Sequence, residues 1–154
     1  MRISDYLSVN TIFPDLKSNN KEQVIQEIAS GITKVNPNIN ADRLLEVLMD
    51  RERLCSTALD SGVAVPHGKI SGITDIILGF GKSSEGISYK SLDNKPTHFF
   101  FTLIAPEDSI SIHIRLLARI SKIFKNPELR SRLSKCKTAQ EIYEAILSED
   151  EKYS

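Results

Sequence analysis

The stretch 98–104 (HFFFTLI) is apolar on both of its alternating faces when it is drawn as an extended strand. A strand of this kind belongs in the middle of a sheet that is covered on both sides, because either face would otherwise expose large apolar side chains to water. We therefore expect a central strand over 97–105. Two shorter β-rich pieces, 62–65 and 76–80, precede it and predict further strands of the same sheet.

Helical patterns lie on both sides of this β-rich stretch. The polar run 18–20 precedes an amphipathic segment and predicts a helix over about 21–34. Asn40 caps a second amphipathic helix, which should carry Arg51 in or just past its last turn. The first third of the chain therefore supplies helices that can cover the sheet.

The helical period returns after Pro106. Its apolar stripe is wide enough to predict a long, largely buried helix. The residues of that stripe are Ile110, Ile112, Ile114, Leu116, Leu117, Ile120, Ile123 and Phe124. Asn126-Pro127 opens a short helix, and the capping box from Thr138 to Glu141 opens the last one. The order of elements predicts an α/β (α+β) single-domain sandwich over 1–154, whose central mixed sheet of about five strands is flanked by helices on both faces.

Charge and hydropathy exclude several classes of function. The 154 residues carry 20 Lys and Arg against 20 Asp and Glu, a formal net charge of zero, so we expect no nucleic-acid partner and no anionic membrane surface as a ligand. The apolar stretch 96–106 is too short to span a bilayer, and Asp5 interrupts any secretory leader. We therefore expect a cytoplasmic protein without direct membrane insertion.

A basic segment runs from Arg115 to Lys137, with eight basic residues and one acid. Arg115, Arg119 and Lys122 fall on one helical face, opposite the apolar stripe. We interpret that face as solvated and balanced by the acidic C-terminal segment. No aromatic residues are interleaved with the charges, so a single-strand binding platform is not indicated.

Two histidines are candidates for chemistry. His67 lies in 62–69 (GVAVPHGK), where a proline stops the strand and a glycine clears the backbone. This setting presents an imidazole to an approaching group, although a histidine that merely contacts solvent in a turn is an equal alternative. His113 lies on the long helix and, taken alone, favours a core histidine. The spacing of His and Cys residues is not that of a zinc site, so we expect neither a metal nor a cofactor.

The segment 51–57 (RERLCST) places positive charge and hydroxyls at a helix end. The guanidinium of Arg51 is a fork of donors that suits phosphate oxygens, and Ser56 and Thr57 could add two hydroxyl donors. The alternative is that Arg51 only compensates the helix dipole. Cys55 is expected to be a small buried thiol rather than a nucleophile.

Taken together, these motifs resemble a known family. They are Arg51-Glu52, Ser56-Thr57, 62–69, Asp93-Asn94-Lys95-Pro96, Ala105-Pro106, and His113 followed by Leu116-Leu117-Ala118, in the family's order over nearly the whole chain. They are similar to the fructose/mannitol-type (type 2) IIA domains of the bacterial phosphoenolpyruvate-dependent sugar phosphotransferase system, which include nitrogen-regulatory IIA proteins.

The resemblance implies that His67 is the phosphorylated histidine, that Arg51 and His113 are its neighbours, and that Ser56 and Thr57 are the family's hydroxyl pair. It implies a donor, the histidine phosphocarrier protein, and an acceptor, which is either a IIB component for sugar uptake or a regulatory target. The chemistry agrees, because most imidazoles are neutral near pH 7 and can attack phosphorus without a separate base.

Overall fold

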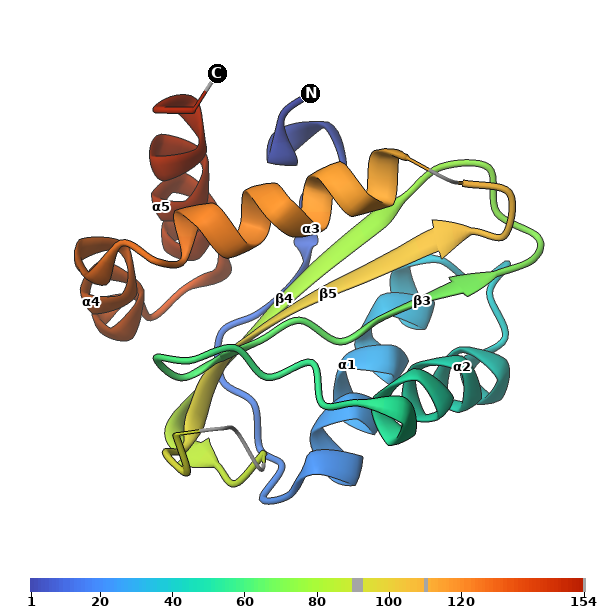
Figure 1. Ribbon diagram of the computed structural model, residues 1–154, viewed down its shortest axis with the longest axis horizontal. Helices are drawn as coiled ribbons and strands as arrows, with labels where there is room; N and C mark the ends of the chain where they lie inside the picture. Colours follow the sequence, from blue (N-terminus) through green and yellow to red (C-terminus); the bar gives the residue numbers. More distant parts are fainter. Residues whose placement is uncertain (90–92, 110, 154) are drawn as a thin grey trace.

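The computed structural model describes residues 1–89, 93–109 and 111–153. In these ranges the five α-helices begin close to the expected positions, whereas a short 3-10 helix near the N-terminus was not predicted. The helical elements are labelled in Figure 1 or can be followed there by their colour. They are η1 (Ile3–Asp5), α1 (Lys21–Val35), α2 (Ala41–Leu54), α3 (Ile112–Ile123), α4 (Pro127–Lys135) and α5 (Ala139–Glu151).

Within the described residues, five strands form one mixed sheet. β5 (Thr97–Pro106) lies inside it, antiparallel to β4 (Ile77–Ile87) on one side. On its other side β5 pairs in parallel first with β2 (Val63–Ala64) and then with β3 (His67–Ile70). β1 (Leu7–Phe13) pairs in parallel with β4 and forms the far edge. The predicted mixed sheet and its central strand are confirmed.

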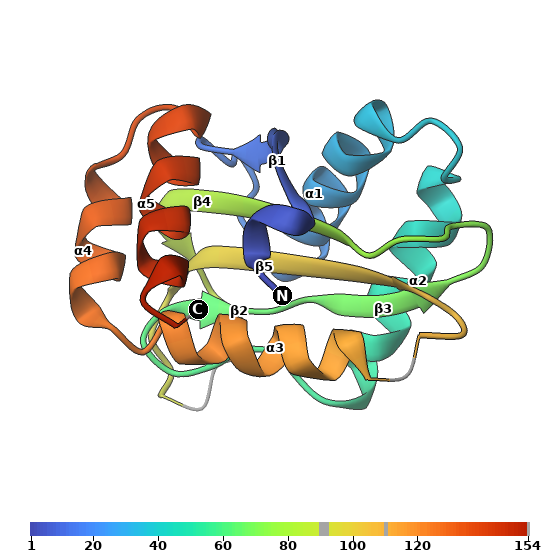
Figure 2. The same cartoon turned by 90° about the horizontal axis from the view of Figure 1, so that it is seen from above.

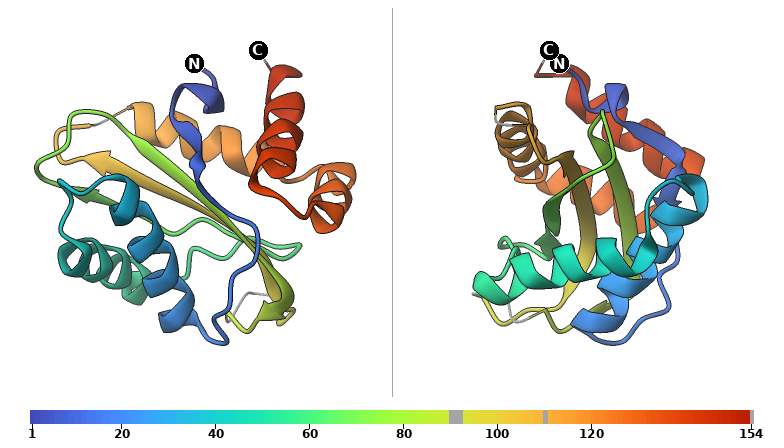
Figure 3. Two further views of the ribbon diagram at one scale, coloured as in Figure 1. Left: turned by 180° about the vertical axis from the view of Figure 1, so that it is seen from behind. Right: turned by 90° about the vertical axis from the view of Figure 1, so that its right-hand side faces the viewer.

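The side chains of β5 divide between two hydrophobic cores. Phe99, Phe101 and Leu103 belong to the core under α3, α4 and α5, whereas Phe100 and Ile104 belong to the core under α1 and α2. Figures 1 and 3 show these two helical layers on opposite sides of the sheet. The apolar character of both faces of 98–104 therefore has the predicted cause, a strand buried on each side.

The predicted helix starts are made by side-chain caps. Asn20 and Asn40 each accept a hydrogen bond from a backbone N–H of the first turn that follows. Asn126 does the same for α4, and Thr138 and Glu141 form a complete capping box for α5. These bonds satisfy N–H groups that have no partner within the helix, which is why short polar residues mark the starts in sequence.

Strands β1 and β4 differ from the predictions. β1 was not predicted, because its register shifts between Leu7 and Ile12 and interrupts the alternation that marks a strand. β4 runs to Ile87 rather than ending at residue 80, and the polar residues Lys82 and Ser83 that follow Gly81 are buried. Lys82 there donates to the carbonyls of Ser134 and Cys136 at 3.0 and 2.5 Å.

The first turn of α3 is more exposed than predicted. Ile112 and Ile114 are 38% and 59% exposed, whereas Leu116, Ile120 and Ile123 are buried. The helix lies along one face of the sheet (Figure 2), and in its N-terminal turn His113 is half-buried while its neighbours are exposed. The expectation of a largely buried helix was therefore wrong for this turn. Ile110, the first residue of the predicted stripe, lies outside the described residues.

The basic face of α3 is not simply solvated. Arg119 forms an ion pair with Asp150 and donates to the carbonyls of Asp150 and Tyr153. Lys122 lies over the ring of Tyr153, 4.9 Å from its centroid. Asp150 also accepts from the backbone N–H of Ile3 at 2.9 Å, so the two ends of the chain lie side by side (Figure 3). The acidic C-terminal segment covers part of the basic face instead of balancing it through solvent.

Among the helices of the described ranges, none combines the length and the apolar character that crossing a bilayer requires.

The two faces of α3 give a stability prediction. Ile120→Ala removes a fully buried side chain and should lower the free energy of unfolding by about 2–5 kcal/mol. Ile114→Ala, on the exposed turn of the same helix, should change it by no more than about 0.5 kcal/mol. Urea unfolding followed by circular dichroism measures both values. Equal losses in the two variants would contradict the orientation of α3.

Candidate active site

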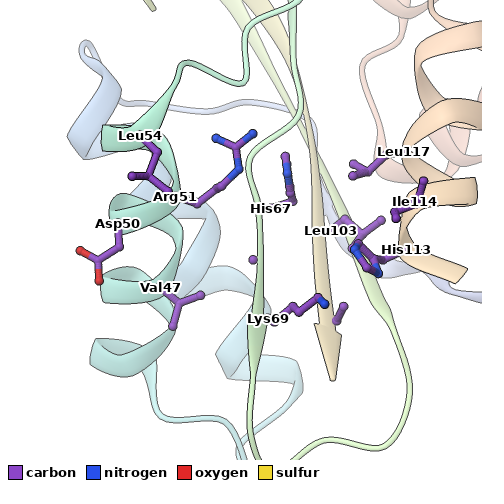
Figure 4. Close-up of a pocket in the computed structure, with 12 residues that line it drawn as sticks. Val47, Asp50, Arg51, Leu54, His67, Lys69, Leu103, His113, Ile114 and Leu117 are labelled. Atoms are coloured by element: carbon purple, nitrogen blue, oxygen red, sulfur yellow. The ribbon is translucent and has the colours of Figure 1, made fainter. Parts of the chain in front are cut away.

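An open hollow of about 760 Å³ lies at the β3 edge of the sheet, between α2 and α3 (Figure 4). Arg51, His67 and His113, which are far apart in sequence, all line it. The other lining residues are Val47, Asp50, Leu54, Gly68, Lys69, Leu103, Ala105, Ile114 and Leu117. The structure thus brings together three of the five candidate residues.

The register of β3 determines which way His67 points. His67 pairs with Leu103 of β5, and Leu103 belongs to the core beneath α3, so the imidazole lies on the α3 face of the sheet. Gly68 faces α2, where a Cβ would stand only 2.5 Å from Cγ1 of Val47. Glycine therefore lets α2 pack closely against the edge strand, and Arg51 reaches around that edge toward the imidazole (Figure 4).

His67 begins a strand rather than lying in an exposed turn, and its ring is half-buried. Its Nδ1 lies 2.7 Å from the carbonyl oxygen of Val65. A carbonyl can only accept, so the hydrogen bond assigns the proton to Nδ1 and leaves the lone pair of the neutral ring on Nε2. The atom available as a nucleophile is therefore Nε2.

The charge state of His67 follows from its neighbours. Burial has the largest effect and lowers the pKa of His67 below its ordinary value. The positive charges of Arg51 and His113 lower that pKa further, while the Val65 carbonyl and Glu52 act in the opposite sense. The net effect favours the neutral ring at pH 7, which is the form with a free lone pair.

Arg51 lies in the last turn of α2, as predicted. One of its terminal nitrogens donates to the carbonyl of Cys55 at 2.8 Å, which is the helix-end contact that the dipole alternative requires. A guanidinium has five N–H donors, and this contact uses one of them. Figure 4 shows the group directed toward His67, so its other donors are placed to meet an anion there.

His113 lies in the first turn of α3 and is half-buried against the hollow. Its Nδ1 is buried and meets no hydrogen-bond partner within the described residues. Burial lowers the pKa of His113, and the positive charge of Lys69 acts in the same direction. This is not the environment of a satisfied core histidine, because such a residue would have a partner at Nδ1, whereas the His113 ring has none there within the described residues and lines the hollow.

Ser56 and Thr57 do not line the hollow. The Thr57 hydroxyl is buried and donates to Oε1 of Glu52 at 2.5 Å, and the Ser56 hydroxyl accepts from the N–H of Ala58 at 3.2 Å. The two hydroxyls are therefore engaged within their own turn. Cys55, expected to be a buried thiol, is exposed, because the turn after α2 directs it to solvent.

Sequence reasoning missed two features of the hollow. Lys69 lines it beside His67, and the two-residue spacing on a strand was a usable signal, since alternate residues share a face. The rim carries exposed apolar side chains, with Leu54 84% and Ile114 59% exposed. In the sequence, Ile114 belongs to the apolar stripe of a predicted buried helix, and Leu54 lies only within the helix-end segment 51–57. Throughout 1–89, 93–109 and 111–153, no group of three His, Cys, Asp or Glu side chains is placed to hold a metal ion.

Comparison with known families gives a match over most of the chain. The sequence profile of the family described as "Phosphoenolpyruvate-dependent sugar phosphotransferase system, EIIA 2" matches residues 5–149. A nitrogen regulatory protein of Bradyrhizobium diazoefficiens is 34% identical over 146 residues, which are 95% of this chain and 95% of that protein. A fructose-specific EIIABC component of Bacillus subtilis is 30% identical over 97% of this chain, but the chain spans only 24% of that longer protein.

Solved structures share the fold. The crystal structure of the nitrogen regulatory protein IIA-Ntr from Neisseria meningitidis superimposes with a TM-score of 0.87 at 26% identity, covering 94% of this chain and 98% of that one. Enzyme IIA of the mannitol system of Escherichia coli, in a complex with phosphorylated IIB, gives a TM-score of 0.75 at 18% identity, covering 92% and 96%. The second likeness shows the fold alone.

The electrostatics of the hollow give a titration prediction. Arg51→Gln removes a positive charge beside His67, so the pKa of His67 should rise toward its ordinary value. Imidazole C–H resonances followed by NMR against pH measure the change. His113 is the internal reference, because Lys69 rather than Arg51 is the charge that acts on it. An unmoved His67 titration would contradict this account of the site.

Proposed function

Since the chain belongs to the EIIA type 2 family of the phosphoenolpyruvate-dependent sugar phosphotransferase system, we propose that it is a phosphocarrier that holds a phosphoryl group on Nε2 of His67. It accepts this group from the histidine phosphocarrier protein and passes it to a IIB component. The observation that carries the proposal is the meeting of His67, Arg51 and His113 in one hollow, with the lone pair of His67 on Nε2. We propose that 1–154 acts as a single phosphocarrier domain.

The transfer needs little covalent machinery. The Nε2 lone pair forms a bond to phosphorus as the bond to the donor's phosphohistidine nitrogen breaks, and the donor imidazole keeps that electron pair. The Val65 carbonyl holds the Nδ1 proton throughout, so no base is required. The protein must therefore only place the donor and acceptor nitrogens in line and compensate the charge of the phosphoryl group, as in phosphoryl transfer generally.

Arg51 and His113 supply that compensation. A phosphoryl group brings about 1.5–2 negative charges, and a hydrogen bond from a charged donor to such a group is worth roughly 1.5–3 kcal/mol. The arriving anion also raises the pKa of His113, which favours its protonated, donating form. The same cationic surroundings that disfavour a proton on His67 therefore favour a phosphoryl group there.

The rim supports a protein as the partner. Leu54, Ile112 and Ile114 expose apolar side chains around or beside the hollow. Exposed apolar side chains gathered at a functional hollow are typical of protein docking surfaces. A IIB acceptor is supported by the solved complex of the mannitol IIA and phosphorylated IIB enzymes, and by the fructose-specific relative, whose name joins A, B and C components.

A regulatory role is the second candidate. The relative that matches this chain over 95% of both lengths is a nitrogen regulatory protein. In this case the chemistry of His67 is unchanged, but the added charge at the apolar rim controls whether a target protein binds. Transfer to a purified IIB component supports the transport role, while target binding that differs between the phosphorylated and free forms supports the regulatory one.

Phosphorylation of His67 is tested directly by incubation with labelled phosphoenolpyruvate, enzyme I and the histidine phosphocarrier protein. One site should be labelled, and the label should be stable in base and lost in acid, as expected of a phosphoramidate. His67→Ala should remain unlabelled, whereas His98→Ala, which changes a histidine outside the hollow, should be labelled normally. Undiminished labelling of His67→Ala would end the proposal.

His113 gives a second test of the mechanism. His113→Ala keeps the nucleophile and should still be phosphorylated, but should pass phosphate on more slowly by about one to two decades, the loss of one charge-assisted donor. His113→Gln should recover part of the rate, because its amide can donate. Rapid-quench measurement of transfer to IIB distinguishes these variants. A wild-type rate in His113→Ala would reduce His113 to a packing residue.

A further inference from the structure

A buried carboxylate lies next to the site, on the residue that follows Arg51. The side chain of Glu52 is only 2% exposed. Its two oxygens accept from four donors, which are the Thr57 N–H at 2.8 Å, the Thr57 hydroxyl at 2.5 Å, the Tyr89 hydroxyl at 2.8 Å and Nζ of Lys21 at 3.0 Å. Glu52 does not line the hollow and takes no part in the transfer described above.

The surroundings keep this carboxylate ionised. Burial acts to raise the pKa of Glu52, but the hydrogen bonds from Thr57, Lys21 and Tyr89 outweigh it, and the pKa is lowered below its ordinary value. Burial and the charge of Glu52 raise the pKa of Tyr89, so its phenol remains a proton donor. Lys21 also lies over the Tyr89 ring, 4.6 Å from its centroid. Glu52 is therefore a fixed negative charge held rigidly beneath the site.

A continuous series of hydrogen bonds leads from Glu52 to the imidazole of His67. Glu52 binds the N–H of Thr57, and the Thr57 carbonyl accepts from the N–H of Val65 at 3.0 Å. The Val65 carbonyl in turn holds Nδ1 of His67 at 2.7 Å. The ring that must present Nε2 is thus oriented by a carbonyl whose own strand is tied to Glu52 through Thr57.

The same turn holds the second functional group. Arg51 donates to the carbonyl of Cys55, two residues before Thr57. Because Glu52 binds both the N–H and the hydroxyl of Thr57, it closes the turn 52–57 on itself. One buried side chain therefore fixes the anchor of Arg51 and the strand that orients His67.

We propose that Glu52 is a positioning residue for the phosphoryl transfer, which orients His67 and Arg51 through the turn 52–57 and balances the positive charge gathered around His67. Its kinetic part rests on the proposed function, whereas its effect on the free His67 ring does not. The charged groups that act on His67 are Arg51 and Glu52 from α2 and His113 from α3, while Lys69 of β3 and Asp50 of α2 line the same hollow.

The test compares Glu52→Gln with Asp150→Asn. Asp150 is a matched control, because it is also a buried carboxylate that binds a backbone N–H and a cation, but it belongs to α5 at the far end of the sheet (Figure 1). Each change removes one buried negative charge. Loss of general stability should therefore affect both variants, whereas positioning of His67 should be lost only in Glu52→Gln.

The first readout is NMR of the unphosphorylated protein. In Glu52→Gln the imidazole of His67 should titrate at lower pH than in the wild type, since the balancing charge is gone. Its ring 15N shifts should report a smaller population with the proton on Nδ1. Asp150→Asn should leave both signals unchanged. Wild-type titration and ring shifts of His67 in Glu52→Gln would overturn the proposal, even in a protein that never carries phosphate.

The second readout is the rate of labelling from the histidine phosphocarrier protein. Glu52→Gln should be labelled roughly tenfold more slowly at saturating donor, with an unchanged KM, since the docking rim is intact. Asp150→Asn should keep the wild-type rate. A slower rate without any change at the His67 ring would contradict positioning. Failure of the wild type itself to be labelled would overturn the proposed function and leave the ring measurements decisive for Glu52.

A milder pair of variants guards against misfolding of Glu52→Gln. Thr57→Val keeps the size of the side chain and the backbone bond to Glu52 but removes the hydroxyl bond, whereas Thr57→Ser retains both. Thr57→Val should shift the His67 ring signals and labelling rate in the same direction as Glu52→Gln by a smaller amount, and Thr57→Ser should restore them. Wild-type behaviour of Thr57→Val in both measurements would overturn the role of this turn.

Discussion

The burial of β5 on both faces is the constraint on which the rest of the structure depends. Its alternating phenylalanines require one layer of helices above the sheet and another below it. Because β5 pairs with β2 and β3 in succession along one side, Pro66 can interrupt that side without breaking the sheet, and His67 resumes the pairing opposite Leu103. The helical layers then reach the same edge from its two sides, so that α2 delivers Arg51 and α3 delivers His113. The position of the site therefore follows from the two helical layers that cover β5.

Local patterns predicted the parts of the fold that local chemistry determines. The caps at Asn20, Asn40 and Thr138 and the doubly apolar strand each have a signature within a few residues. β1 and the outward turn of α3 could not be predicted in the same way. A register shift conceals the alternation of β1, and the exposure of Ile114 depends on where α3 lies along the sheet, which is a property of tertiary packing.

The residues of the candidate site also fall into those that the sequence predicts and those that only the folded structure shows. His67, Arg51 and His113 were recognisable because their motifs carry the family resemblance, and the hollow brings them together. Glu52 gave no sign of burial, since a glutamate in a charged helix end is ordinarily solvated. Only the folded chain shows that Thr57, Tyr89 and Lys21 converge on it from three separate segments. The Thr57 hydroxyl, which the sequence predicts as a possible donor to phosphate, donates to Glu52 instead.

In the function that we propose, the site must hold a phosphoryl group firmly enough to receive it and loosely enough to pass it on. Unopposed cations around His67 would favour receipt of the phosphoryl group but hinder its release. Each contact with the dianion that must be broken adds to the barrier for its departure. Arg51 is partly engaged by the Cys55 carbonyl, and Glu52 places a negative charge behind the imidazole. Both features reduce the positive field at Nε2 without removing the donors. The hollow is lined by two imidazoles, Arg51, Lys69 and Asp50, and the buried carboxylate of Glu52 lies behind it. Such a mixture of charges is closer to a balanced exchange than to a phosphate trap.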